Sequence, residues 1–227
     1  MTNFATRMLI NVIGIPALLL LINLGGIPFV MFLTVVAFIA QVELYLLMRK
    51  KGADPLIIPT VIAGIVWMFM AYYSPENLFN LLIGLVALIL LAGLFRKVQG
   101  ATFDLAGTLL GLIYLPVLIS TAILMRNITD YGRSIVTIMF VTIWICDSLA
   151  FVFGKWLGHR KIAPLISPYK TVAGCVGGLF GAIATVLIFY WLKWTPGFMS
   201  VPELLIFAAL AGVFGQAGDF VESIFKR

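Results

Sequence analysis

Charged side chains are scarce in this sequence: Asp, Glu, Lys and Arg make up 11% of its 227 residues, whereas 63% are hydrophobic. Soluble domains are typically about 25% charged and about 45–50% apolar. The mean hydropathy of +1.14 points the same way. This composition excludes a water-soluble globule, a coiled coil and a disordered chain, and it indicates that the surrounding solvent is a lipid bilayer.

Histidine and cysteine are almost absent. The chain has one histidine, His159, and two cysteines, Cys146 and Cys175, with no C-x-x-C spacing. A zinc centre built from several His and Cys ligands is therefore not expected. Both cysteines lie in apolar stretches, where such residues behave as small hydrophobes, so a disulfide framework is not expected either.

Long apolar runs occupy most of the chain. A spanning helix needs about 20 apolar residues, and a helix satisfies its own backbone hydrogen bonds in lipid. The runs predict an all-α, polytopic integral membrane protein with about eight transmembrane helices, at 8–24, 27–48, 56–73, 78–95, 103–125, 134–153, 171–192 and 202–221. We expect a single transmembrane domain, 1–227, whose candidate site lies in 131–227 and whose helices in 1–130 carry a weaker signal.

The basic residues are distributed unevenly about these helices. With the N-terminus on the inner side, three of the 15 lie on the outer side, at Arg126, Arg133 and Lys193. The other twelve lie on the inner side: Arg7, Arg49, Lys50, Lys51, Arg96, Lys97, Lys155, Arg160, Lys161, Lys170, Lys226 and Arg227. Because short loops rich in Lys and Arg stay in the cytoplasm, both termini are predicted to be cytoplasmic. We therefore attribute the net charge of +6 to membrane topology and to the binding of anionic phosphates, not to the binding of nucleic acid.

Four acidic residues fall within the predicted spans or at their cytoplasmic ends: Glu43, Asp147, Asp219 and Glu222. A carboxylate at the centre of a membrane helix costs about 2.5–3.5 kcal/mol, so such residues are functional candidates. Two carboxylates near one water-accessible cavity, here Asp147 and Asp219, suit Mg²⁺. The structural alternative is an ion pair, such as Glu222 with Lys226 or Asp147 with a loop lysine, and for Glu43 the structural role is favoured.

The stretch 154–171 follows the Asp147 helix and contains four Lys and Arg residues but no acid. It also carries the hydroxyls of Ser167 and Thr171, and the next helix begins there, so its free N–H groups can bind an anion. By charge alone, a role in membrane topology or in binding anionic lipid headgroups is the better explanation. Its position beside Asp147 favours a phosphoryl or nucleotidyl transferase. In the next helix G-x-x-x-G occurs at 174/178 and 177/181, which favours close helix packing.

Three stretches resemble, in order, the bacterial phosphatidate cytidylyltransferases, or CDP-diacylglycerol synthases: WICDSLAF at 144–151, KIAPLISPYKTVAG at 161–174 and GDFVESIFKR at 218–227. The likeness covers about the last 85 residues, and the first five helices match in hydropathy only. Tyr169 and Ala173 stand where the family pattern has a basic residue and a glutamate. The family pattern continues with P-G-H-G-G and D-R-x-D segments whose acids complete a metal site, so we expect this chain to lack part of that site.

The resemblance implies that phosphatidate and CTP give CDP-diacylglycerol and pyrophosphate in phospholipid biosynthesis, at the cell inner (cytoplasmic) membrane. It implies Asp219 and Asp147 as ligands of Mg²⁺, with a second cation left open, and a catalytic role for Lys170. It also implies five residues that hold substrate: Ser167, Thr171, Ser223, Lys226 and Arg227. Membrane lipid is an expected partner, and a homodimer is left open.

Three other functions stay open. A transporter or lipid scramblase would use the intramembrane acids as a proton or ion relay, although no inverted repeat or pair of broken midplane helices is evident. A related transferase, such as a lipid kinase or an archaeal CDP-archaeol synthase, would share the metal and phosphate chemistry. The third is a truncated, inactive homologue.

Overall fold

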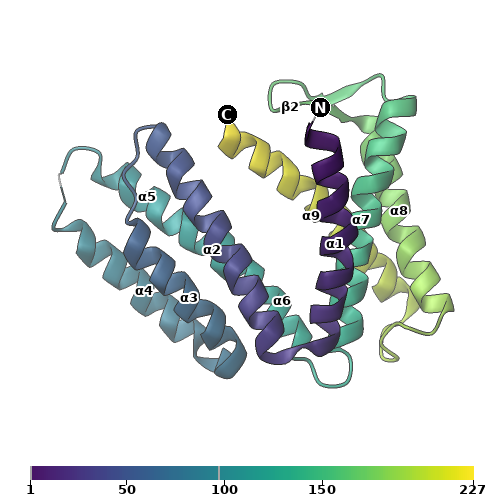
Figure 1. Ribbon diagram of the computed structural model, residues 1–227, viewed down its shortest axis with the longest axis horizontal. Coiled ribbons are helices and arrows are strands. Elements are labelled where there is room, and N and C mark those ends of the chain that lie inside the picture. Colours follow the sequence, from purple (N-terminus) through teal and green to yellow (C-terminus); the bar gives the residue numbers. More distant parts are fainter. Residues whose placement is uncertain (1, 97) are drawn as a thin grey trace. The chain divides into compact units, whose positions relative to one another are not determined.

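The computed structural model describes residues 2–96 and 98–227, and it describes side chains for 13–96 and 98–227. Lys97 and the side chain of Arg7, both counted in the predicted charge bias, lie outside these described residues. Two compact units follow one another along the chain, Met1–Asp130 and Tyr131–Arg227. The elements of each unit can be followed in Figure 1.

The first unit is built from helices alone. In order they are α1 (Thr2–Leu24), α2 (Gly26–Lys50), α3 (Ile57–Tyr73), the 3₁₀ turn η1 (Pro75–Asn77), α4 (Leu78–Gly93), α5 (Ala101–Leu112), the π-helical turn η2 (Ile113–Val117) and α6 (Leu118–Arg126). The last three form one continuous apolar run. The π turn contains Pro116, which has no N–H to give to the helical ladder.

A buried polar network joins three helices of this unit. The Tyr45 hydroxyl on α2 donates to the Thr108 carbonyl on α5, at 2.9 Å. The Gln41 side-chain amide, one turn earlier on α2, donates to the Thr60 carbonyl on α3 at 3.2 Å. Unpaired polar groups are expensive in an apolar medium, so these bonds specify how the three helices meet.

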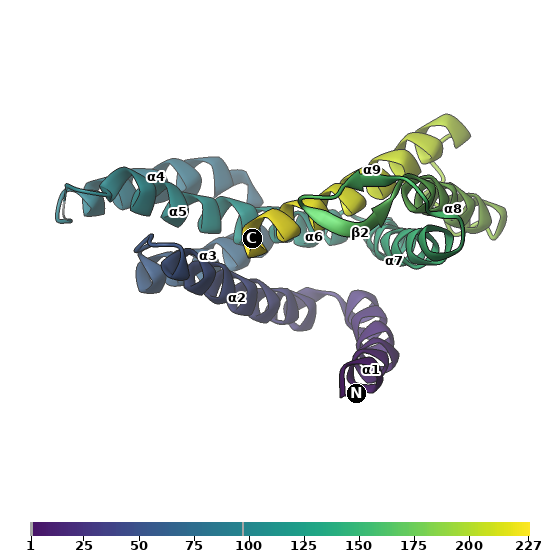
Figure 2. The same cartoon turned by 90° about the horizontal axis from the view of Figure 1, so that it is seen from above.

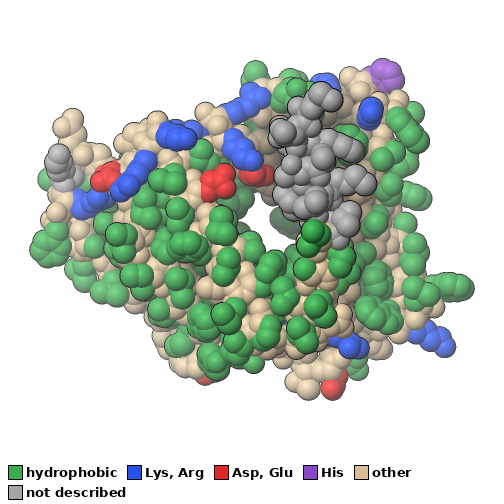
Figure 3. Space-filling model, in the orientation of Figure 1, with side chains coloured by type: hydrophobic (Ala, Val, Ile, Leu, Met, Phe, Trp, Pro, Cys, Tyr) green, Lys and Arg blue, Asp and Glu red, His purple; other side chains and the backbone are tan. Residues whose placement is uncertain are grey.

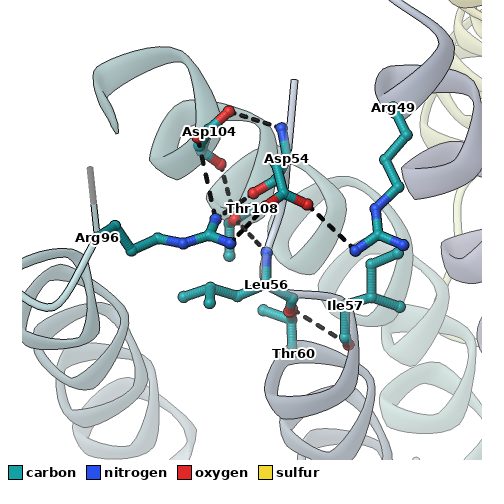
Figure 4. Close-up of polar contacts among 8 residues, drawn as sticks. All are labelled: Arg49, Asp54, Leu56, Ile57, Thr60, Arg96, Asp104 and Thr108. Atoms are coloured by element: carbon teal, nitrogen blue, oxygen red, sulfur yellow. Dashed lines mark hydrogen bonds and ion pairs between the residues drawn. The ribbon is translucent and has the colours of Figure 1, made fainter. Parts of the chain in front are cut away.

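A charged cluster closes one end of the same helices (Figure 4). The Arg96 guanidinium donates to the Asp54 carboxylate at 2.7 Å, and Arg49 donates to its other oxygen at 3.1 Å. The Asp104 carboxylate at the start of α5 accepts the backbone N–H of Asp54 at 2.6 Å. The link between α2 and α3 is therefore tied to α5 and to the segment that follows α4.

The second unit consists of α7 (Gly132–Leu157), β1 (Lys161–Ala163), β2 (Ser167–Thr171), α8 (Val172–Trp191) and α9 (Val201–Lys226). Figures 1 and 2 both show α7 and α8 side by side, and α9 packs against both. The stretch 154–171, which the sequence suggests is a loop, instead forms the last turn of α7 and an antiparallel hairpin. Pairing places Lys161 opposite Thr171 and Ala163 opposite Ser167.

Glycines let α8 approach α7 closely. A Cβ at Gly174 would lie 2.6 Å from the carbonyl oxygen of Ala150, and one at Gly178 would lie 2.9 Å from that of Cys146. Real Cβ atoms do not come that close to backbone oxygens, so any larger residue would push the helices apart. The packing interpretation of the two G-x-x-x-G motifs is confirmed.

The all-α, polytopic membrane architecture is also confirmed. Within the described part of the chain, six helices are long and apolar enough to span a bilayer, and Ile13–Leu24 and α3 are apolar but shorter. On the face drawn in Figure 3, apolar side chains cover the middle of the helices, and the Lys and Arg side chains lie near the helix ends. The number of spans and the cytoplasmic side of the termini remain predictions.

Candidate active site

A cavity of about 520 Å³ opens in the second unit among α7, the hairpin, α8 and α9. Its polar lining combines two carboxylates with three lysines and three further polar side chains. These are Asp147, Lys155, Lys161, Tyr169, Lys170, Thr171, Gln216 and Asp219. Residues from four elements, far apart in sequence, thus converge on one space.

Lys170 and Asp219 form the central contact of this cavity. The Lys170 ammonium on β2 lies 2.8 Å from Asp219 Oδ2 on α9, and it also donates to the Gln216 carbonyl at 3.3 Å. It lies 4.3 Å from the centre of the Phe220 ring. The two charged side chains remain 24% and 48% exposed, so both can reach a ligand in the cavity.

The Asp147 carboxylate lines the same cavity from α7. It is exposed, and among the described residues it forms no hydrogen bond or ion pair. The sequence also allowed a structural ion pair between Asp147 and a loop lysine, but no such pair forms among the described residues, and Lys170 pairs with Asp219 instead. Asp147 keeps its oxygen atoms available to a ligand.

Gln216, which sequence reasoning missed, lies one turn before Asp219 on α9. Its side-chain amide donates to the carbonyl of Cys175 on α8 at 3.1 Å and to Cys146 Sγ on α7 at 3.3 Å. The amide fits because Gly178 has no side chain: a Cβ there would lie 2.9 Å from Gln216 Nε2. The one available signal was an amide just after the apolar stretch 204–214 of this helix and one turn before Asp219.

Thr171 lines the cavity and also caps α8, since its hydroxyl oxygen accepts the N–H of Gly174 at 3.1 Å. Lys155 and Lys161 line the cavity as well. Sequence reasoning had named neither lysine as a site residue, although it offered the basic stretch 154–171 that contains them for phosphate binding as well as for membrane topology. The sequence showed that both lysines belong to the basic stretch 154–171. It did not show where each side chain would point.

Four predicted substrate-binding residues are not among the described residues that line the cavity: Ser167, Ser223, Lys226 and Arg227. The Ser223 hydroxyl donates to the Asp219 carbonyl at 2.8 Å. Lys226 pairs with Glu222, as the structural alternative anticipated, and Arg227 donates to the Leu165 carbonyl. Their contacts with substrate phosphates stay predictions.

The donor set fits Mg²⁺. Mg²⁺ is usually held by one or two carboxylates together with waters and substrate phosphates rather than by an all-protein cage. Asp147 and Asp219 share the cavity, and Lys170 contacts one oxygen of Asp219, Oδ2. In residues 2–96 and 98–227 no three His, Cys, Asp or Glu side chains cluster as a metal cage would require.

Fold and site together define a polytopic membrane protein in which two acids and three lysines share one cavity. The model of the cytidylyltransferase family matches residues 5–227. The chain is 32% identical over 235 residues to the phosphatidate cytidylyltransferase of Bacillus subtilis (strain 168), covering 100% of this chain and 86% of the relative. The protein therefore belongs to the cytidylyltransferase family.

Two further relatives carry the same name. The phosphatidate cytidylyltransferase of Staphylococcus aureus (strain COL) is 28% identical over 225 residues, and that of Staphylococcus saprophyticus is 29% identical over 227 residues. Each alignment covers 97% of this chain and 84% of the relative. The family resemblance proposed from three motifs is confirmed, and it extends over nearly the whole chain rather than the last 85 residues alone.

Proposed function

We propose that this protein transfers CMP from CTP to phosphatidate, giving CDP-diacylglycerol and pyrophosphate. The observation that carries the proposal is the cavity in which Asp147, Asp219 and three lysines meet. All of these residues lie within the unit that contains the three motifs. The names of the relatives support the same substrates.

The reaction needs positioning and charge neutralisation more than it needs a protein nucleophile. An oxygen of the phosphatidate phosphate attacks the α-phosphorus of CTP, and the bond from that phosphorus to the β-phosphate oxygen breaks, so pyrophosphate leaves with its electron pair. Lys155, Lys161 and Lys170 line the cavity that would receive the triphosphate. Lysine ammonium groups bind phosphates as point charges, and a fixed orientation of the two reactants lowers the barrier.

Asp147 and Asp219 are the residues that would hold Mg²⁺. When bound, the ion supplies positive charge that offsets the charge of the triphosphate and of the departing pyrophosphate. Lys170 neutralises Asp219 before substrates enter and can exchange that carboxylate for a substrate phosphate. A second cation and a homodimer remain predictions.

The protein is a multi-pass membrane protein by its apolar helices. We infer that it lies in the inner (cytoplasmic) membrane with the cavity on the cytoplasmic side, because one substrate is water-soluble and the other is a lipid. Lys155, Lys161, Lys170 and Lys226 all lie toward one end of α7, α8 and α9, which is the end predicted to be cytoplasmic.

The test is CMP transfer from labelled CTP to phosphatidate by the purified protein with Mg²⁺, repeated with a chelator. Asp219→Asn should lower turnover by more than 100-fold while the protein still inserts and purifies normally. The matched control is Glu76→Gln, which alters an exposed carboxylate on η1. Turnover like that of the unmodified protein in Asp219→Asn, or in the presence of chelator, would reject the metal-ligand role.

A transporter or scramblase would give a different result in the same preparation. It would move ions or lipids across proteoliposome membranes without nucleotide, and CTP would not be consumed. Nucleotide-independent flux together with absent CMP transfer would replace the proposed activity.

A further inference from the structure

A second hollow, of about 780 Å³, lies in the second unit on α7 and α8. Its walls are mostly apolar and include Phe153, Leu157, Val172, Val176, Gly177 and Phe180. It has no lining residue in common with the active-site cavity. We call it the α7–α8 groove.

The groove and the active-site cavity lie on opposite sides of α8. Val172, Val176 and Phe180 recur every four residues and line the groove, whereas Thr171, Gly174 and Cys175 line the cavity. At 3.6 residues per turn these two sets point in opposite directions. A ligand in the groove would therefore not compete directly with substrate.

The floor of the groove is closely packed. The Phe153 ring lies on Gly177, where an added Cβ would come within 2.5–2.7 Å of its atoms. From Val172 to Phe180 the groove follows α8 for about 12 Å, given a rise of about 1.5 Å per residue. Val176 and Phe180 are 63% and 65% exposed, so the surface accepts an elongated apolar group.

A single positive charge marks one end of the groove. Arg160 lines it, no acidic residue does, and the Arg160 side chain forms no hydrogen bond or ion pair with the other described residues. The Arg160 backbone is held, since its carbonyl accepts the N–H of Val172 at 2.9 Å. His159 also lines the groove, and its Nδ1 lies 3.1 Å from the Leu157 carbonyl oxygen.

The α7–α8 groove is apolar, lies on two helices long enough to span a membrane, and has a guanidinium at one end. It is therefore complementary to an amphiphile with acyl chains and an anionic head group. Guanidinium groups bind phosphate through two parallel hydrogen bonds. We propose that the α7–α8 groove binds one anionic phospholipid of the surrounding leaflet, with its phosphate at Arg160 and an acyl chain along Val172, Val176 and Phe180. This site is separate from the one that would bind the lipid substrate.

The experiment is native mass spectrometry of the full chain, purified in detergent and supplied with equal amounts of phosphatidylglycerol and phosphatidylcholine of identical acyl chains. Phosphatidylglycerol serves as the probe because it is not the proposed substrate, and CTP is omitted. The unmodified protein should retain one phosphatidylglycerol in preference to phosphatidylcholine. Arg160→Gln should lower that preference about fivefold, the usual effect of one basic residue near anionic lipid.

Matched variants separate charge from shape. Arg160→Lys should keep most of the preference, and Val176→Trp should lower retention of both lipids by filling the groove. Arg133→Gln, which removes a charge at the other end of α7, should change nothing. Equal retention of the two lipids by the unmodified protein, or an unchanged preference in Arg160→Gln, would overturn the proposal.

Two further outcomes would also overturn it. Displacement of the lipid by millimolar inorganic phosphate would mean that the site binds a phosphate without acyl chains. A lipid-free dimer that Val176→Trp dissociates would assign the groove to a second copy of the chain.

Discussion

Replacing Gln216 with leucine should impair catalysis through the positions of Asp219 and Lys170, because the Gln216 amide is bonded to α7 and α8. Gln216 is a positioning residue: its side chain ties α9 to α7 and α8, and its backbone carbonyl accepts a hydrogen bond from Lys170. Asp219 lies one turn further along the same helix. Leucine keeps the approximate volume and the helix propensity while removing both side-chain hydrogen bonds.

The magnitude follows from the two bonds that are lost. A hydrogen bond between neutral groups contributes about 0.5–1.5 kcal/mol, and the bond to Cys146 Sγ is the weaker of the pair. The total is therefore about 1–2 kcal/mol. If this energy holds Asp219 and Lys170 in place, kcat/KM for CTP should fall about tenfold, since about 1.4 kcal/mol corresponds to a factor of ten.

The assay compares kcat and KM for CTP in Gln216→Leu with those of Thr142→Val. Thr142 is a matched control because its buried hydroxyl on α7 has no hydrogen-bond partner among the described residues. Gln216→Leu should lower kcat/KM, and Thr142→Val should not. A Gln216→Leu protein that unfolds more easily but has unchanged kcat and KM would show that the amide only stabilises the fold, and the positioning role would be refuted.

Two other substitutions test the site and the first unit. Lys170→Ala should raise the KM for CTP at least tenfold while the protein still inserts, because it removes one of three cavity lysines; an unchanged KM would leave Lys170 with a topological role alone. Asp104→Ala should lower the free energy of unfolding in detergent by about 1.5–3 kcal/mol, because the Asp54 N–H loses a charged acceptor at 2.6 Å. Glu76→Ala, at an exposed carboxylate, is its control, and equal stability of the two variants would contradict the importance of the cluster.

Much of the helical framework could be predicted from hydropathy. The runs at 78–95 and 202–221 correspond to α4 (Leu78–Gly93) and α9 (Val201–Lys226), and 103–125 corresponds to α5, η2 and α6 taken together. Long apolar runs are strong signals because the bilayer admits few alternatives to a helix. The hairpin of β1 and β2 escaped prediction because strands of three and five residues are stabilised by each other rather than by local sequence.

The candidate site was predicted in part. Asp147 and Asp219 stood out because ionisable groups are rare in apolar spans, and both line the cavity. Ser223 and Lys226 share the motif with Asp219, but they do not line the cavity. Proximity in sequence is therefore a poor guide to which side chains of a helix reach the same space.

Composition and motifs alone indicated that the chain belongs in a membrane and that it is helical. They also indicated which acidic residues are candidates for a functional role. Only the tertiary structure decided that Lys170 on β2 meets Asp219 on α9, that Lys155 and Lys161 share their cavity, and that Gln216 ties the helices beneath them. The physical reason is the rotation of each helix about its axis. That rotation is set by packing contacts, such as the glycines of α8 against α7, which no stretch of sequence specifies by itself.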